Sequence, residues 1–205
     1  DEKQKLVSAK LAHQLQWYEQ AIFSLADAGY WDDVELRFPL AFQQEISQSA
    51  AKAEIDSGWA MAIARRESSF MADAASPVGA RGLMQLMPAT AREIAKKPVK
   101  LAQLYNPVTN IDYGTDYLNY LRKRNDGNLL MATAAYNAGY SRVKQWVPQD
   151  YAVPADVWVE TIPYRETRDY VKAVMAYYQI YNIRLNTPTD VFKPLTTMQI
   201  GVVVD

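Results

Sequence analysis

Residues 129–135 restrict the folds available to this chain more than any other stretch. They carry only leucine, methionine and alanine with one threonine, so a helix over them is apolar on nearly every side. A helix without a polar face must be surrounded by other elements. The segment leads into Tyr136 and Asn137, and Gly139 is typical of a helix stop. The sequence therefore predicts a mainly helical fold whose buried central helix presents Tyr136 and Asn137 at its C-terminal end.

Residues 61–70 place a carboxylate where a charge is unexpected. Read as a helix, this stretch puts Glu67 on the same face as Ala60, Ile63 and Ala64. Burial on an apolar face disfavours an ionised carboxyl and raises its pKa, which suits a general acid. The alternative is that Glu67 lies at the helix end in contact with water. These residues alone favour that alternative, because structural carboxylates outnumber catalytic ones.

Composition removes several classes of chemistry. The 205 residues include no cysteine and one histidine, His13. Thiolate catalysis, thiolate metal sites and disulfides are therefore excluded, and a serine–histidine–aspartate triad or a multi-histidine metal site is implausible. No phosphate-binding loop, dinucleotide fingerprint or calcium loop is present. We expect no cofactor and no metal, and an active site built from carboxylate, tyrosine or lysine side chains.

Charge and hydropathy restrict the partners. The formal net charge is −1 and no basic block occurs, which disfavours nucleic acid as a partner. No apolar run approaches the length of a transmembrane helix. Residues 1–5 do not resemble a signal peptide. We therefore expect either a cytoplasmic protein or a mature fragment of a longer one.

The first part of the chain is expected to be helical. Residues 5–28 read as helix, with a break near Gln16 and a stop at Gly29, and residues 40–55 read as a further helix. The apolar stripe expected in the first region comprises Leu11, Leu15, Tyr18, Ile22 and Leu25. These helices carry no obvious site and indicate repeat units from a longer helical array.

Capping residues mark the later helices. Asp56 or Ser57 is a suitable N-cap for the helix that carries Glu67, and Asn106 caps another. Gly114 lies inside that second helix, where glycine costs about 1 kcal/mol relative to alanine. We therefore expect it to mark a close approach of two helices. Pro163 begins a long helix that reaches about residue 185.

Three further residues have competing interpretations. Gln85 is polar within an apolar run and needs a hydrogen-bond partner. Met87 lies in the same run, where core filler is the usual role of methionine. Glu166 lies in the first turn of the long helix, where a negative charge is favourable with the helix dipole. On local grounds that structural role is favoured for Glu166 over a functional one.

Three motifs in order resemble those of a known family. They are Glu-Ser at 67–68, Gly-Leu-Met-Gln at 82–85 and Ala-Tyr-Asn at 135–137. Each is weak alone, but together, at these intervals, they resemble the signature motifs of the soluble lytic transglycosylases. The connecting residues 76–80 and 162–168 share the likeness, which runs from about Ile55 to Tyr181.

The resemblance implies a fold and a domain organisation. Residues 39–187 would form a mainly helical, lysozyme-like catalytic domain with little or no sheet. Residues 1–38 would be the end of an α-superhelical linker, since residues 36–40 are similar to that part of the large periplasmic members. Residues 188–205 would form a C-terminal tail extended over the surface. The chain would then be the C-terminal part of a periplasmic enzyme, without its signal peptide and most of its helical ring.

The resemblance also implies a reaction. Glu67 would protonate the glycosidic oxygen between N-acetylmuramic acid and N-acetylglucosamine in peptidoglycan, with assistance from the substrate's N-acetyl group. The ionised Glu67 would then take a proton from the C6 hydroxyl of the sugar, which closes a 1,6-anhydro ring without water. One carboxyl would therefore act first as acid and then as base, where ordinary glycosidases use two.

The family pattern assigns roles to further residues. Tyr136 would orient the acetamido group or stabilise developing charge, and Ser76 would hydrogen-bond Glu67. The residues expected to line the sugar site are Gln85, Met87 and Asn137. Glu166 would face the peptide stem or the far side of the groove. Arg81 departs from the pattern, because a smaller residue is expected in that loop, and it would alter contacts near the groove.

Partners and alternatives follow from the same resemblance. Glycan strands and peptide stems of peptidoglycan would be the partners of a monomeric enzyme, and the sequence names no cell-wall synthesis partner. One alternative is a g-type lysozyme, in which Asp73 or Asp112 would position a hydrolytic water. The other is a helical peptidoglycan-binding module without catalysis, which the presence of Glu67, Ser76, Gln85 and Tyr136 disfavours.

Overall fold

Helix α8, Leu129–Ala138, is enclosed by the rest of the molecule, as the sequence predicts. Its side chains from Leu130 to Ala138 are buried apart from Met131, Tyr136 and Asn137, and it packs against α7, α9 and α11. The computed structural model describes residues 2–202. The helices in chain order are α1 (Glu2–Gln14), α2 (Tyr18–Asp27), α3 (Val34–Arg37), α4 (Gln43–Lys52), α5 (Ser57–Ser68), α6 (Pro88–Ala95), η1 (Leu101–Tyr105), α7 (Pro107–Arg124), α8, α9 (Tyr140–Trp146), α10 (Ala155–Thr161), α11 (Arg165–Arg184) and η2 (Lys193–Thr196). The strands are β1 (Ala152–Pro154) and β2 (Gln199–Gly201).

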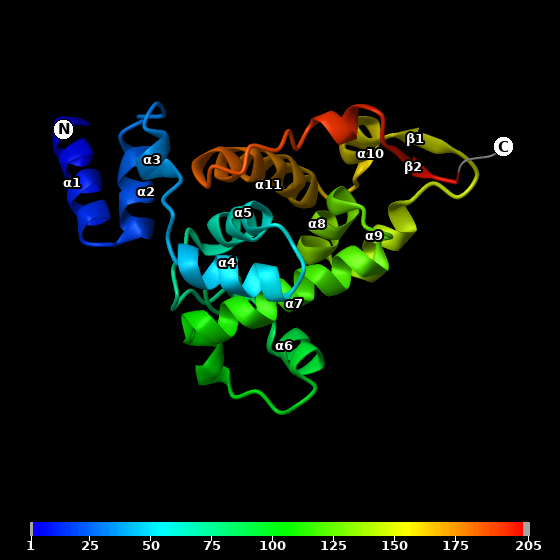
Figure 1. Ribbon diagram of the computed structural model, residues 1–205, viewed down its shortest axis with the longest axis horizontal. Helices are drawn as coiled ribbons and strands as arrows, with labels where there is room; N and C mark the ends of the chain where they lie inside the picture. Colours follow the sequence, from blue (N-terminus) through cyan, green and yellow to red (C-terminus); the bar gives the residue numbers. More distant parts are fainter. Residues whose placement is uncertain (1, 203–205) are drawn as a thin grey trace.

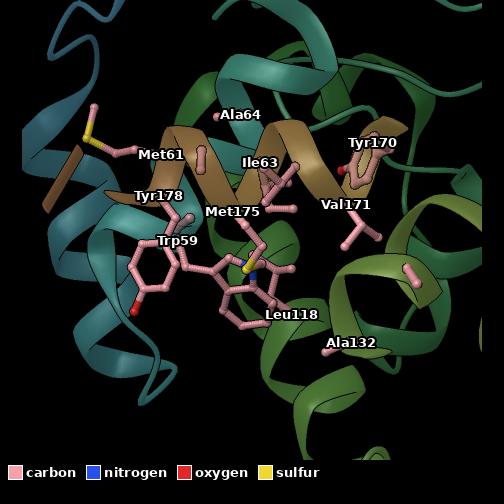
Figure 2. Close-up of a cluster of buried hydrophobic side chains, with 14 of the residues drawn as sticks. Trp59, Met61, Ile63, Ala64, Leu118, Ala132, Tyr170, Val171, Met175 and Tyr178 are labelled. Atoms are coloured by element: carbon pink, nitrogen blue, oxygen red, sulfur yellow. The ribbon is translucent and has the colours of Figure 1, made fainter. Parts of the chain in front are cut away.

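The main core lies between α5 and α11. Helix α5 is buried continuously from Gly58 to Ala64, because small alanines let neighbouring helices approach on every side. Figure 2 shows Val171, Met175 and Tyr178 of α11 among these buried side chains. The indole nitrogen of Trp59 donates a 3.0 Å hydrogen bond to the hydroxyl of Thr133, which ties α5 to α8. The two helices that end beside the candidate site are therefore fixed by the core.

Helices α1, α2 and α3 gather at one end of the molecule (Figure 1). The expected break occurs at Gln16, whose φ is 60°, and Gly29 has a φ of 64°. The expected apolar stripe is wrong in its first half, since Leu11 and Leu15 are 54% and 55% exposed. The break changes the face that the chain buries, and α1 buries its small residues Ala9 and Ala12 instead.

Residues around Phe38 attach these helices to the rest of the fold. The guanidinium of Arg184, at the end of α11, donates 2.8 Å hydrogen bonds to the carbonyls of Glu35 and Phe38. The Phe38 ring meets Tyr177 and Tyr181 of α11 edge to face, with centroids 5.0 and 5.8 Å apart. Arg65 of α5 also donates a 2.9 Å hydrogen bond to the Arg37 carbonyl, so both α5 and α11 carry this contact. The boundary between residues 38 and 39 stays a prediction.

The C-terminal segment differs from the expected surface tail over residues 188–205. Strand β2 pairs antiparallel with β1, with Ile200 opposite Val153. Val191 and Ile200 are only 7% and 2% exposed, because their apolar side chains pack into the main core. Residues 203–205 lie outside the described part of the chain. The fold is otherwise helical, and no described helix is both long and apolar enough to cross a membrane.

Candidate active site

Glu67 lies in the last turn of α5, near the end of that buried helix. Part of its side chain is exposed, but its carboxyl group is enclosed by protein, and this burial raises its pKa to about 7. A hydrogen bond from Tyr170 and the charge of Arg66 oppose the rise in pKa, and the charge of Glu166 adds to it. Desolvation exceeds these opposing effects, so the carboxyl gains and loses its proton near neutral pH. Glu67 thus lies at the helix end, as the alternative has it, but its carboxyl group is enclosed by protein.

Tyr170, in the second turn of α11, is the direct partner of Glu67. Its hydroxyl donates a 2.5 Å hydrogen bond to Oε1 of Glu67, and its ring is buried at one end of the cluster in Figure 2. Burial and the neighbouring Glu67 charge raise the pKa of Tyr170 well above its ordinary value. Sequence reasoning missed this residue. Tyr170 is four residues before the buried Val174 of α11, so helical spacing could have placed it on the same inner face.

Tyr136 reaches the same site from the C-terminal end of α8. Its hydroxyl donates a 2.8 Å hydrogen bond to the carbonyl of Met84. Burial, followed by the charge of Glu67, raises the pKa of Tyr136 well above its ordinary value. The phenol therefore stays protonated, and because its proton is directed to Met84, its oxygen remains free to accept. The structure thus brings the predicted pair of Glu67 and Tyr136 together.

Asn110 of α7 holds the loop that supplies the Met84 carbonyl. Its side-chain oxygen accepts a 2.7 Å hydrogen bond from the Met84 amide, and its nitrogen donates to the carbonyls of Arg81 and Leu104 at 3.0 and 2.9 Å. Gly114 of the same helix lies against the Met84 side chain, which a Cβ at this position would overlap. The close approach predicted at Gly114 is therefore with this loop and not with another helix.

Ser76 does not occupy its expected position. Its hydroxyl accepts a 3.0 Å hydrogen bond from the Ala80 amide, and no hydrogen bond joins it to Glu67 in the described chain. Ser76 instead closes the tight turn of residues 76–80, where the nearest free donor is local. The contact between α5 and the loop comes from Ser68, whose hydroxyl donates a 2.7 Å hydrogen bond to the Leu83 carbonyl.

The remaining residues of this loop either hydrogen-bond within it or are exposed to solvent. Gln85 finds the partners it requires, because its amide nitrogen donates to the carbonyls of Gly82 at 2.8 Å and Ala74 at 3.2 Å. Arg81 donates to the Ala80 carbonyl at 2.9 Å and so braces the turn. Met87 is 41% exposed, so it is not core filler and remains available for contact.

Asn137 and Glu166 meet where α8 ends and α11 begins. The hydroxyl of Thr167 donates a 2.6 Å hydrogen bond to the side-chain oxygen of Asn137. The nitrogen of Asn137 donates a longer, 3.4 Å hydrogen bond to Oε1 of the exposed Glu166. Thr167, which the sequence did not single out, thereby orients Asn137. The charge of Glu166 also reaches Glu67, so this corner belongs to the same site.

The two carboxylates proposed for a hydrolytic alternative are not among the groups that shift the pKa of Glu67. Asp73 is exposed, and Asp112 accepts a 2.5 Å hydrogen bond from Ser49 of α4. The carboxylate that affects the pKa of Glu67 is Glu166. Within residues 2–202, no group of three potential metal-ligating side chains occurs.

Comparison with family models matches three parts of the chain. The Transglycosylase SLT domain model matches residues 44–159. The Soluble lytic transglycosylase helical domain model matches residues 161–189, and the Soluble lytic murein transglycosylase L domain model matches residues 1–34.

Relatives and solved structures agree with these matches. The soluble lytic murein transglycosylase of Escherichia coli K12 is 40% identical over 179 residues, which cover 84% of this chain and 28% of the relative. A crystal structure of an inactive mutant of lytic transglycosylase Slt from Pseudomonas aeruginosa superposes with a TM-score of 0.89 at 44% identity, over 93% of this chain and 32% of that one. A complex of the 70-kDa soluble lytic transglycosylase with bulgecin A gives a TM-score of 0.85 at 35% identity, over 97% of this chain and 32% of that one. The chain thus spans about a third or less of the length of these proteins.

Proposed function

The chain belongs to the Transglycosylase SLT domain family, and from that premise we propose that it cleaves the β-1,4 bond between N-acetylmuramic acid and N-acetylglucosamine in peptidoglycan without water. The observation that carries this proposal is the enclosed Glu67 carboxyl, with a pKa of about 7 and a tyrosine hydroxyl as its hydrogen-bond partner. A carboxyl of this kind can give up and take back a proton within one catalytic cycle.

The first half of the reaction uses Glu67 as an acid. With a pKa of about 7, close to half of the carboxyl is protonated at neutral pH. That proton passes to the glycosidic oxygen as the bond to the anomeric carbon breaks, and the acetamido oxygen of the substrate compensates the charge that develops there. Burial supports this step because it keeps the proton available where a solvent-exposed glutamate would have lost it.

The second half uses the ionised Glu67 as a base. The carboxylate takes the proton of the C6 hydroxyl, the C6 oxygen bonds to the anomeric carbon, and a 1,6-anhydro ring closes. The proton removed from C6 restores the acid, so the cycle balances without a second carboxylate and without water. The hydrogen bond from Tyr170 stabilises the carboxylate between the two halves, since hydrogen bonds to charged groups are the stronger ones.

Tyr136 contributes an acceptor beside this carboxyl. Because its own proton is bonded to the Met84 carbonyl, its oxygen can accept from the acetamido N–H or lie against the positive charge at the anomeric carbon. Either contact would be strongest as charge develops, which is the requirement for catalysis. We propose Glu67 and Tyr136 as the catalytic residues and Tyr170 as the residue that positions and stabilises Glu67.

The surrounding residues would bind substrate. Gln85 uses its nitrogen within the loop, so its amide oxygen is left to accept from a sugar hydroxyl or N–H. Met87 offers an exposed apolar surface to a sugar ring, and Asn137 and Glu166 present polar groups at the junction of α8 and α11. Ser76 would contribute through the turn that it closes, and not through Glu67. From the family resemblance we also propose that the protein acts in the periplasm, as a monomer.

A cell-wall clearing assay tests whether the protein is an enzyme. Wild-type protein should reduce the turbidity of isolated peptidoglycan, and Glu67→Gln should lose at least about a hundredfold in rate, which is the lower range for removal of a general acid. Asp32→Asn, a charge change at an exposed loop position before α3, is the matched control and should behave as wild type. Equal behaviour of wild type and Glu67→Gln would favour the non-catalytic binding module.

A further inference from the structure

A row of aromatic rings leads away from Tyr136 along one face of α7. The Tyr117 ring lies against Tyr136, with centroids 5.3 Å apart, and stacks on Tyr120, with centroids 6.2 Å apart. Arg124 follows on the same face, since positions 117, 120 and 124 are spaced by three and four residues. The row therefore connects the catalytic corner to the C-terminal end of α7, beside α9 (Figure 1).

Arg124 is held in place at the far end of this row. Its guanidinium donates a 2.6 Å hydrogen bond to the Tyr120 hydroxyl and lies 3.9 Å from the centroid of the Tyr140 ring. An arginine stacked on one ring and bonded to another has lost much of its rotamer freedom before any ligand arrives. A group fixed in this way binds with less entropic cost than a free surface arginine.

The guanidinium faces a polar hollow of about 580 Å³. Its lining residues are Arg124, Tyr140, Ser141, Lys144, Gln145 and Gln149. The lining holds two cations and no carboxylate, and among residues 2–202 neither Arg124 nor Lys144 takes part in an ion pair. The hollow is thus an uncompensated positive site with hydroxyl and amide groups around it.

We propose that this hollow binds a carboxylate of the peptide stem that peptidoglycan carries, while the sugar lies at Glu67 and Tyr136. The proposal rests on the proposed function, because that function supplies the substrate. Arginine can bind a carboxylate through two parallel hydrogen bonds, and Lys144 adds a second positive charge. The side-chain amide of Gln145, and the amide oxygen of Gln149, whose nitrogen donates to the Val147 carbonyl at 2.8 Å, match the backbone groups of a peptide, which a small inorganic anion lacks. Tyr117 and Tyr120 lie between the two ends of the substrate and offer it apolar ring edges and hydroxyl groups.

Direct binding measurements test this assignment without relying on turnover. The probe is a synthetic acidic stem tetrapeptide, titrated into the full chain and followed by NMR, beside the same peptide with every carboxyl amidated. We expect the acidic peptide to shift signals of Arg124 and of α9, and amidation to weaken binding at least about tenfold. Arg124→Gln and Lys144→Gln should weaken it to a similar degree.

Lys123→Gln is the matched control, since it removes one positive charge from the neighbouring position, where the lysine pairs with Glu54 at 3.6 Å. It should leave the affinity within about twofold of wild type. Equal binding of the two peptides, unchanged binding by both Arg124→Gln and Lys144→Gln, or no peptide binding at all would overturn the proposal. Inorganic phosphate is the third probe. If phosphate displaces the acidic peptide when both are at the same concentration, the proposal is also overturned, because the site would then select negative charge alone.

Cleavage of peptide-free glycan strands separates this proposal from the proposed function. Cleavage by a wild-type protein that does not bind the peptide leaves the function standing and rejects the stem site. Carboxylate-dependent peptide binding without cleavage of any glycan supports the stem site and rejects the proposed reaction. When both hold, Arg124→Gln should lower kcat/KM on peptide-bearing strands about tenfold and leave peptide-free strands unaffected.

Discussion

The hydroxyl of Tyr170 donates a 2.5 Å hydrogen bond to Oε1 of Glu67, across a separation of 103 residues in the chain. This bond joins the end of α5 to the first turns of α11, the two helices that share the main core. It opposes the effect of burial on Glu67, since it lowers a pKa that desolvation raises. The balance of these two influences sets the proton equilibrium on which the proposed reaction depends.

Tyr170→Phe should raise the pKa of Glu67 above about 7, because the hydrogen bond that lowers it is lost. The alkaline limb of kcat/KM against pH should therefore move to higher pH. At the same time kcat should fall about ten- to a hundredfold, since a hydrogen bond to a charged group contributes about 1.5–3 kcal/mol. Steady-state kinetics on glycan oligomers over a range of pH values measure both changes.

Tyr181→Phe is the control for that variant. Tyr181 lies on the same helix, and its buried hydroxyl has no hydrogen-bond partner within residues 2–202. Its removal should leave the pH profile unchanged and should not lower stability. A pH profile for Tyr170→Phe identical to that of wild type would show that the hydrogen bond does not control Glu67.

Glu67→Gln should change how stability depends on pH. The folded pKa of about 7 lies above the ordinary value of 4.5, so between these values the folded state binds more protons than the unfolded state. Wild-type stability from this group is therefore fully present below about pH 4.5 and is lost as pH rises through 7. At about 1.4 kcal/mol for each pH unit between the two pKa values, the loss is about 3.5 kcal/mol.

Urea unfolding at pH 5 and pH 8 measures this effect. Glutamine cannot ionise, so the free energy of unfolding of Glu67→Gln relative to wild type should increase between the two pH values. Asp73→Asn, at an exposed position, should show no such increase. A difference between Glu67→Gln and wild type that does not change with pH would mean that burial does not raise the pKa.

Gly114→Ala should impair both stability and activity. A Cβ at this position overlaps the Met84 side chain, and overpacking of this kind costs about 1–3 kcal/mol, against about 1 kcal/mol gained in helix propensity. Any shift of Met84 also moves the carbonyl that holds the Tyr136 hydroxyl. Thermal unfolding and kcat should therefore both decrease, whereas Asp116→Ala, exposed on the same helix, should lower neither. Full activity of Gly114→Ala would show that the position of Met84 does not matter.

Local sequence patterns predicted the elements whose cause is local. The uninterrupted apolar segment of α8, the N-caps Asp56 and Asn106, and the stop at Gly139 depend on neighbouring residues, and the structure confirms them. Helical spacing predicted Glu67 on a buried face; the structure instead buries α5 on every side from Gly58 to Ala64 and leaves Glu67 half-buried in its last turn. The helix breaks near Gln16, so the residues before the break bury a different face from those after it. The prediction that Leu11 is buried was therefore wrong.

Local sequence patterns could not predict contacts between segments that are far apart in the chain. Nothing near Tyr170 in the chain indicates that its hydroxyl meets Glu67, which lies 103 residues away. Thr167 likewise lies 30 residues from Asn137, which it orients. Ser76 shows the opposite error, since a family role was expected where the turn of residues 76–80 uses the hydroxyl locally. Glu67 and Tyr136, the proposed catalytic residues, were therefore easier to predict than Tyr170 and Thr167, which hold site residues in place.

The products of peptidoglycan digestion test the central claim, that Glu67 alone serves as acid and base without water. Wild-type protein is incubated with peptidoglycan in water enriched in heavy oxygen, and the released muropeptides are measured by mass spectrometry. The account predicts 1,6-anhydromuramic ends, which are lighter by one water than hydrolytic products and carry no heavy oxygen from the solvent. Reducing ends that contain the heavy oxygen would contradict it and identify the reaction as hydrolysis.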